Sequence, residues 1–288
     1  MKSDLRMLPK QEFPPLLNEI PDLPKKLYCR GTLPDWTANK FLCVVGARKY
    51  SSYGKEVCES LISGLRGLPV VVVSGLALGI DSIAHRTALD AGIQTIAVPG
   101  SGLNPEVLYP SSHRLLAEKI IESGGALISE FEPNFRATAW GFPQRNRIMA
   151  GMSHAVLVIE AEKKSGTLIT SRLATEYNRD VLTVPGSIYS TNSSGPHMLI
   201  RLGATPITSP NELLEALGFM TDDNAPTEKD YSDCSDDEKT LLEILKNPTS
   251  RDDLVRQSEM STGQANAVLS VLEIKGLIKE NMGEFRLV

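Results

Sequence analysis

The 288-residue sequence lacks the apolar segments that membranes and secretion require. No uninterrupted apolar run approaches the roughly 20 residues of a transmembrane helix. The N-terminal stretch MKSDLRMLPKQEFPP has no apolar core of a secretory signal. We therefore expect a cytoplasmic protein without a membrane segment.

Cysteine is scarce, and two common nucleotide motifs are missing. The four cysteines (Cys29, Cys43, Cys58 and Cys234) show no C-x-x-C spacing, which argues against a zinc site or a disulfide framework and favours buried, reduced thiols. The sequence has no G-x-x-x-x-G-K-[ST], and its glycine-rich loops do not fit G-x-G-x-x-G. These absences disfavour a P-loop ATPase and a nicotinamide cofactor. We expect no cofactor and no metal.

The net charge of −5 is unevenly distributed along the chain. Residues 219–288 contain 8 Lys/Arg and 15 Asp/Glu, a net charge of −7, whereas residues 1–218 contain 22 and 20, a net charge of +2. Whole-chain acidity therefore does not exclude a local site for nucleic acid on the first part of the chain.

Composition divides the chain into four parts. Residues 1–40 contain six prolines and predict an arm without long regular elements, packed on the following domain. Residues 219–235 are acidic and poor in aliphatic side chains, which is typical of a linker. Residues 236–288 predict three short helices and a β-wing, as in a winged-helix domain.

Residues 41–218 alternate short apolar runs with amphipathic stretches, which predicts a Rossmann-like, doubly wound α/β domain. Continuous runs such as VVVVS (70–74) indicate strands buried on both faces of a mostly parallel sheet. The predicted strands are 41–45, 70–74, 95–98, 126–129, 155–160 and 181–184. The predicted helices lie near 53–66, 80–91, 112–123, 143–152, 167–178 and 195–202.

In such a sheet, ligands bind where strand-end loops lead into helix N-termini. After the first strand, Gly46 allows a tight turn, and Arg48 and Lys49 supply cations. Taken alone, this loop is equally well explained as a structural turn with a surface arginine. Ser74 and Gly75 end the second strand as a candidate phosphate cradle.

The segment 142–147 is the most informative of these loops. Arg145, Asn146 and Arg147 place two cations and a hydrogen-bond donor beside the positive end of a helix dipole, which is electrostatically poor without an anion. Phe142 offers a face on which a base can stack.

A further loop, Lys164-Ser165-Gly166, opens the next helix and is an anion site by the same physics. The sequence shows no nucleophile–base pair or metal cluster near these loops. Asp81 is expected as a helix cap or first-turn carboxylate, and His113 as a surface residue. Cations beside an aromatic stacking face are better suited to binding a polynucleotide than to catalysis.

These residues lie in stretches that resemble the DNA processing protein A family (DprA, also called Smf). The matching stretches are VVGARKYSSYG (44–54), VVSGLALGIDSIAHRTAL (72–89), TIAVPGSGLNPEVLYPSSHRLL (95–116), GGALISEFEP (124–133), FPQRNRIMAGMSHAVLVIEAEKKSGTLITSRLA (142–174) and VPGSI (184–188). They follow the family's order and spacing over about residues 41–208.

The resemblance implies a homodimeric, non-enzymatic protein that binds single-stranded DNA, protects incoming DNA in natural transformation and loads the recombinase RecA onto it. The implied DNA-binding residues are Gly46, Arg48, Lys49, Ser74, Gly75, Phe142, Arg145, Asn146, Arg147, Lys164, Ser165 and Gly166. The predicted recognition helix of the winged-helix module, 261–275, has Lys275 as its single cation. We therefore favour a protein contact, or a weak DNA role, for that module.

An enzymatic alternative stays open. Nucleotide phosphoribohydrolases of the lysine-decarboxylase-like group share a Rossmann-like fold, and their P-G-G-x-G-T-x-x-E pattern joins a phosphate nest to a catalytic glutamate. The corresponding string here, Lys164 to Thr170, keeps the nest but has Thr170 in place of the glutamate. Another alternative is a scaffold for RecA with DNA contact secondary.

Overall fold

The structure, a computed structural model, describes residues 5–220, 231, 233–281 and 283–287. The chain divides into two compact units, Met1–Thr221 and Asp222–Val288. Most of the predicted linker, namely residues 221–230 and 232, lies outside the described residues. In the described part of the chain, no helix is both long and apolar enough to cross a bilayer.

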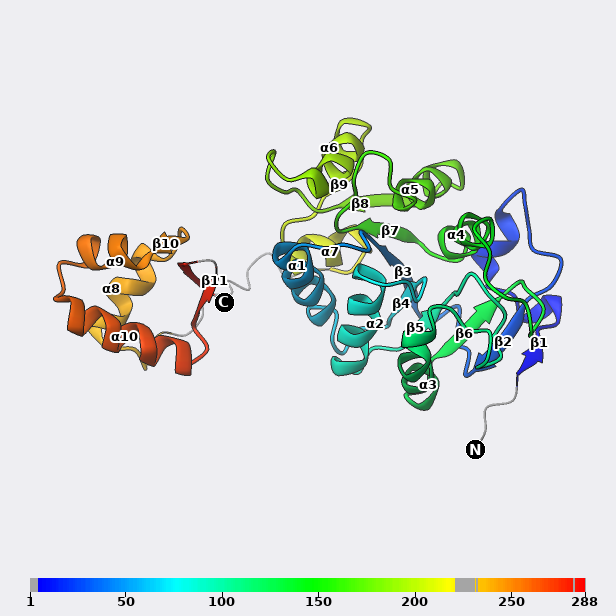
Figure 1. Ribbon diagram of the computed structural model, residues 1–288, viewed down its shortest axis with the longest axis horizontal. Coiled ribbons are helices and arrows are strands. Elements are labelled where there is room, and N and C mark those ends of the chain that lie inside the picture. The colour runs from blue at the N-terminus through cyan, green and yellow to red at the C-terminus, as the bar shows by residue number, and fades with distance from the viewer. Residues whose placement is uncertain (1–4, 221–230, 232, 282, 288) are drawn as a thin grey trace. The chain divides into compact units, whose positions relative to one another are not determined.

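The described residues of the first unit form a nine-stranded sheet in the order β1-β2-β6-β5-β4-β3-β7-β8-β9 (Figure 1). The strands are β1 (Arg6–Met7), β2 (Tyr28–Gly31), β3 (Lys40–Val45), β4 (Val70–Ser74), β5 (Thr95–Ala97), β6 (Ala126–Ser129), β7 (Ala155–Val158), β8 (Asp180–Thr183) and β9 (Thr205–Pro206). In this order, all the neighbouring strands from β6 through β5, β4, β3, β7 and β8 to β9 pair in parallel. The strand β2 pairs with β6 antiparallel. The prediction of a mostly parallel, doubly wound sheet is confirmed.

Helices cover both faces of this sheet because its strands bury side chains on both sides. Phe41, Cys43 and Val45 of β3 face one core, and Leu42 and Val44 face the other. The helices are α1 (Ser52–Ser63), α2 (Ile80–Asp90), α3 (Arg114–Glu122), α4 (Gly141–Gly151), α5 (Thr167–Glu176), α6 (Ser194–Arg201) and α7 (Pro210–Ala216). The helices α1, α2, α3 and α7 cover one face, and α4, α5 and α6 cover the other.

The N-terminal segment is part of the main unit. Its strand β2 extends the sheet, and β1 pairs with β2 antiparallel. Between them lie the short 3₁₀ helices η1 (Lys10–Glu12) and η2 (Pro15–Glu19), and η2 carries Leu17 into the core beside α4. The predicted boundary at residue 40 therefore lies inside one folded unit.

The second unit has the helices and the wing of a winged-helix domain. Its elements are α8 (Asp236–Ile244), β10 (Thr249–Ser250), α9 (Arg251–Ser258), α10 (Thr262–Ile274), β11 (Ile278–Asn281) and β12 (Glu284–Leu287). The strands form a small sheet in the order β10-β12-β11. Ser235 and Ser261 each form a capping box at the start of α8 and α10, which explains why these helices begin there. Phe285 is fully buried among leucines of the three helices.

The strand order also indicates where the sheet can bind a ligand. The parallel part of the sheet starts at β3, proceeds through β4, β5 and β6 to one side, and then returns to β7 on the other side of β3. The point where the order reverses, between β3 and β7, opens a crevice outside the carboxyl ends of the strands.

The N-terminal segment predicts a stability experiment. Leu17 of η2 is 0% exposed, whereas Leu115 of α3 is 78% exposed. We expect Leu17→Ala to lower the free energy of unfolding by about 2–5 kcal/mol, because it leaves a cavity beside α4. The matched control, Leu115→Ala, should change it by less than about 0.5 kcal/mol. Equal urea midpoints for the two variants would show that the segment does not belong to the core.

Candidate nucleic-acid interface

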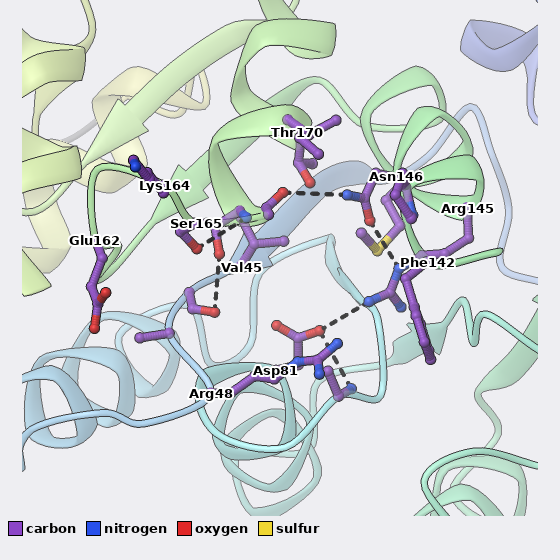
Figure 2. Close-up of a pocket in the computed structure, with 18 of the residues that line it drawn as sticks. Val45, Arg48, Asp81, Phe142, Arg145, Asn146, Glu162, Lys164, Ser165 and Thr170 are labelled. Atoms are coloured by element: carbon purple, nitrogen blue, oxygen red, sulfur yellow. Dashed lines mark hydrogen bonds and ion pairs between the residues drawn. The ribbon is translucent and has the colours of Figure 1, made fainter. Parts of the chain in front are cut away.

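A cleft of about 540 Å³ lies at this reversal of strand order. One wall is the loop after β3, from Val45 to Lys49, and the opposite wall is the loop from Glu162 into α5. The N-terminal half of α4 contributes Phe142 and Asn146 (Figure 2), together with Pro143. The structure thus brings three of the predicted cationic loops to one site.

The rim of the cleft carries three exposed cations: Arg48, Lys49 and Lys164. None of the three has an ion pair with another described residue. The guanidinium of Arg48 lies over the ring of Phe142, with its carbon 5.4 Å from the ring centroid. Such unpaired cations keep their full attraction for an anion.

Arg145 lies deeper and is already occupied. It is buried, and its guanidinium donates hydrogen bonds to the carbonyl oxygens of Gly75 and Val98. Its Nη2 atom is 3.7 Å from a carboxyl oxygen of Asp81. Its Nε atom also donates to the side-chain oxygen of Asn146, at 2.9 Å. A buried guanidinium needs several acceptors, and the structure supplies them from the ends of β4 and β5 and from the helices α2 and α4.

Asp81 is therefore more than a first-turn carboxylate of α2. Besides facing Arg145, it accepts hydrogen bonds from the backbone N–H groups of Gly75, at 3.1 Å, and Ala77, at 3.4 Å. Burial raises the pKa of the Asp81 carboxyl, and Arg145 and the two N–H groups counter that rise. The pair contributes no net charge to the floor of the cleft.

The loop that opens α5 is tied to the loop after β3. The Thr167 hydroxyl donates to the carbonyl oxygen of Gly46 at 3.1 Å, and Ser165 accepts from the Thr167 N–H at 3.2 Å. A Cβ at Gly166 would meet nothing within 4 Å, so the cleft is open beside it. Lys164, Ser165 and Gly166 are thus held at a helix N-terminus that favours anions.

Three other predicted residues serve the structure of the cleft. Ser74 is buried and donates to the Val44 carbonyl, 2.7 Å away. A Cβ at Gly46 would lie 2.7 Å from Ile80, and one at Gly75 would overlap the Arg145 guanidinium. These two positions require glycine because neighbouring side chains fill the space, not because a ligand approaches there.

Arg147 does not line the cleft. Its side chain is buried and points to the other side of α4, where it pairs with Glu130 and, at 3.2 Å, with Asp22. It also donates to the Asp22 carbonyl at 2.6 Å. Residues two positions apart on a helix face nearly opposite directions. Arg145 therefore points toward the cleft, and Arg147 points away from it. We therefore leave Arg147 out of the proposed phosphate contacts.

Glu160 and the histidines complete the supporting structure. Buried Glu160 accepts from the Ser51 N–H at 2.9 Å and from the Ser51 hydroxyl, which fastens the loop after β3. His113, expected at the surface, is buried with Nδ1 2.8 Å from the Leu76 carbonyl, because its segment lies against the loop between β4 and α2. His85 is buried against Thr95, and burial lowers its pKa to about 3, so it stays neutral.

The described residues that line the cleft include few groups that could transfer a proton or bind a metal. Among the described residues, the carboxylates lining the cleft are Asp81, which is fully engaged, and exposed Glu162. No group of three metal-ligating side chains occurs in the described part of the chain. The four cysteines are buried and free of disulfides.

Comparison with protein families decides the relationship. The model of DNA recombination-mediator protein A matches residues 5–218, and the DprA winged helix domain matches residues 224–283. The chain belongs to the DNA recombination-mediator protein A family. The family match begins at residue 5 and so includes the N-terminal segment that joins the sheet.

Several relatives of this family align with the chain. Protein Smf of Escherichia coli is 44% identical over 72% of this chain and 54% of its own length, so the chain spans about half of that relative. DNA processing protein DprA of Streptococcus pneumoniae is 42% identical over 72% of both chains. The X-ray structure of DprA from Streptococcus pneumoniae superposes with a TM-score of 0.68 at 37% identity, covering 76% of each chain. A structure of DNA processing protein A from Helicobacter pylori, reported for its single-stranded DNA binding mode, superposes with a TM-score of 0.67 at 29% identity, covering 75% of this chain and 98% of that one.

The buried pair of Asp81 and Arg145 predicts a stability difference. We expect Asp81→Asn to lower the free energy of unfolding by about 3–5 kcal/mol, because it leaves a buried guanidinium without a counter-charge. The matched control is Asp22→Asn, whose carboxylate is 72% exposed. It should cost less than about 1 kcal/mol, since Arg147 keeps Glu130. Urea unfolding of both variants measures this, and a stable Asp81→Asn protein would contradict it.

Proposed function

We propose that this protein binds single-stranded DNA by holding backbone phosphates in the cleft between β3 and β7. The observation that carries this proposal is the exposed, unpaired set of Arg48, Lys49 and Lys164 around a floor whose charges cancel. Phosphate contacts from such cations dominate the affinity of proteins for nucleic acids.

Several features favour a single strand over a duplex. The cleft is a local crevice at a strand edge, and Phe142 lies within it beside Arg48. An aromatic face next to a phosphate site suits an unpaired base, because a base in a duplex offers only its edge. The Helicobacter pylori relative, which shares the fold of the first unit, is reported with a single-stranded DNA binding mode.

Membership in the family supports the wider role. We propose that the protein acts in the cytoplasm as a homodimer, protects incoming single strands in natural transformation and recombination, and loads RecA onto them. In this role the protein holds the strand and catalyses no reaction on it.

The winged-helix unit supports a protein contact better than a DNA contact. The exposed face of α10 contains Ala267, Ser270, Val271 and Ile274, with no lysine or arginine. Lys275, which follows the helix, is paired with Glu238 at 2.7 Å. A helix that reads a major groove requires free cations and hydrogen-bond donors.

The phosphoribohydrolase alternative lacks support at the position of its catalytic glutamate. Thr170 occupies the position of the catalytic glutamate, and it is buried in the wall of the cleft. Release of free base from nucleoside monophosphates by the purified protein would revive this alternative.

Salt dependence tests the phosphate contacts. We expect Arg48→Ala and Lys164→Ala each to weaken binding of a labelled single-stranded oligonucleotide and to lower the slope of log K against log salt by about 0.7. Fluorescence anisotropy across a salt series measures both quantities. The matched control is Arg66→Ala. Arg66 is an exposed arginine between α1 and the amino end of β4, whereas the cleft lies at the carboxyl ends of the strands. Equal slopes for all three variants would contradict the proposal.

RecA loading separates DNA holding from scaffolding. We expect Arg48→Ala/Lys164→Ala to lose single-strand binding and RecA loading together, because the strand must be held before it is transferred. The assay is RecA filament formation on strands covered with a single-strand-binding protein. Loading that survives without DNA binding would favour the scaffold alternative.

A further inference from the structure

Trp140 is an exposed aromatic side chain that the phosphate cleft does not use. It precedes α4 directly, and its side chain is 58% exposed. The indole packs edge-on against Phe131 and Phe135, with ring centroids 5.5 Å apart in both pairs. These contacts hold the ring in place, and its large exposed fraction leaves surface available to a ligand. An ordered, exposed aromatic face is the element on which single-stranded bases stack.

Trp140 lines a groove of about 430 Å³ that borders the phosphate cleft. Pro143 and Ile169 line both hollows, one from the first turn of α4 and one from the start of α5. The helices α4 and α5 pack against each other beneath this shared rim. A strand with phosphates in the cleft reaches the groove by crossing these two apolar side chains.

The charges of the groove fit a base and not a phosphate. Arg147 in its floor is neutralised by Glu130 and Asp22. Glu176 in its wall pairs with Arg172, at 3.3 Å. No cation is left over to hold an anion among the described residues that line the groove. Its walls instead offer aromatic and aliphatic surface that suits a neutral, flat ring.

We propose that Trp140 is a stacking platform for a nucleobase of the same strand whose phosphates occupy the cleft. This inference rests on the proposed function, and it adds a second contact on the outer side of α4. The base stacks on the exposed face of the indole, and the phosphate on its cleft side remains with Arg48 and Lys164.

The chain offers a direct spectroscopic test, because it has only two tryptophans, Trp36 and Trp140. Trp36 is half-buried and packs on Phe41 with centroids 5.0 Å apart, so Trp36→Phe keeps an aromatic contact there. In this background the emission reports on Trp140 alone. The probes are an oligothymidylate and an abasic oligonucleotide with the same number of phosphates.

We expect both probes to bind by anisotropy, but only the oligothymidylate to quench Trp140. In the chain that keeps Trp36, Trp140→Ala should weaken oligothymidylate binding by about tenfold, the size of one base–aromatic stack, and leave abasic binding unchanged. Trp140→Phe, with a smaller ring, should recover part of the loss.

Three outcomes would overturn the proposal. The first is tight oligothymidylate binding with no change in Trp140 emission and with equal affinity for Trp140→Ala. This result would reject the stacking role of Trp140 and leave the proposed phosphate cleft standing. Equal quenching by the abasic probe shows a change in the protein and not a stack. Failure of both probes to bind at low salt overturns the platform and the proposed function together.

Discussion

The guanidinium of Arg145 is the group on which the geometry of the cleft depends. It joins the end of β4 through Gly75, the end of β5 through Val98 and the start of α2 through Asp81. A charge at this depth is tolerated only when acceptors surround it. Satisfying Arg145 therefore fixes α4 against the strand ends, and with α4 it fixes Phe142 in the cleft.

This arrangement separates the cations into two groups with different roles. Arg145 and Arg147 are buried and neutralised on opposite sides of α4, so they set the position of the helix. Arg48, Lys49 and Lys164 are exposed at the rim. Because the floor is neutral, an anion in the cleft meets the rim cations without repulsion from Asp81. A cation already held in an ion pair has less attraction left for a phosphate, whereas an unpaired cation displaces a condensed counterion from the nucleic-acid backbone when it binds a phosphate.

The main sheet was predictable because its signal is local. Runs such as VVVVS can be satisfied only by strands buried on both faces, and each is followed by an amphipathic stretch that forms a covering helix. The strands β1 and β2 were missed because they are short and lie among prolines. The strand β2 pairs with β6, about a hundred residues later in the chain, and β1 pairs with β2, so no pattern near residue 28 indicates them.

The sequence by itself determined which loops carry the cations and that these loops follow strands of one mostly parallel sheet, because strand–helix alternation and loop composition are both visible as local patterns. Only the tertiary structure decided which of the cations are free. Arg145 and Arg147 are two positions apart and chemically identical, yet one faces Asp81 at the cleft and the other faces Glu130 and Asp22 behind it. Their partners come from distant segments, and burial makes those pairings obligatory, so pairing and exposure exist only in the folded chain.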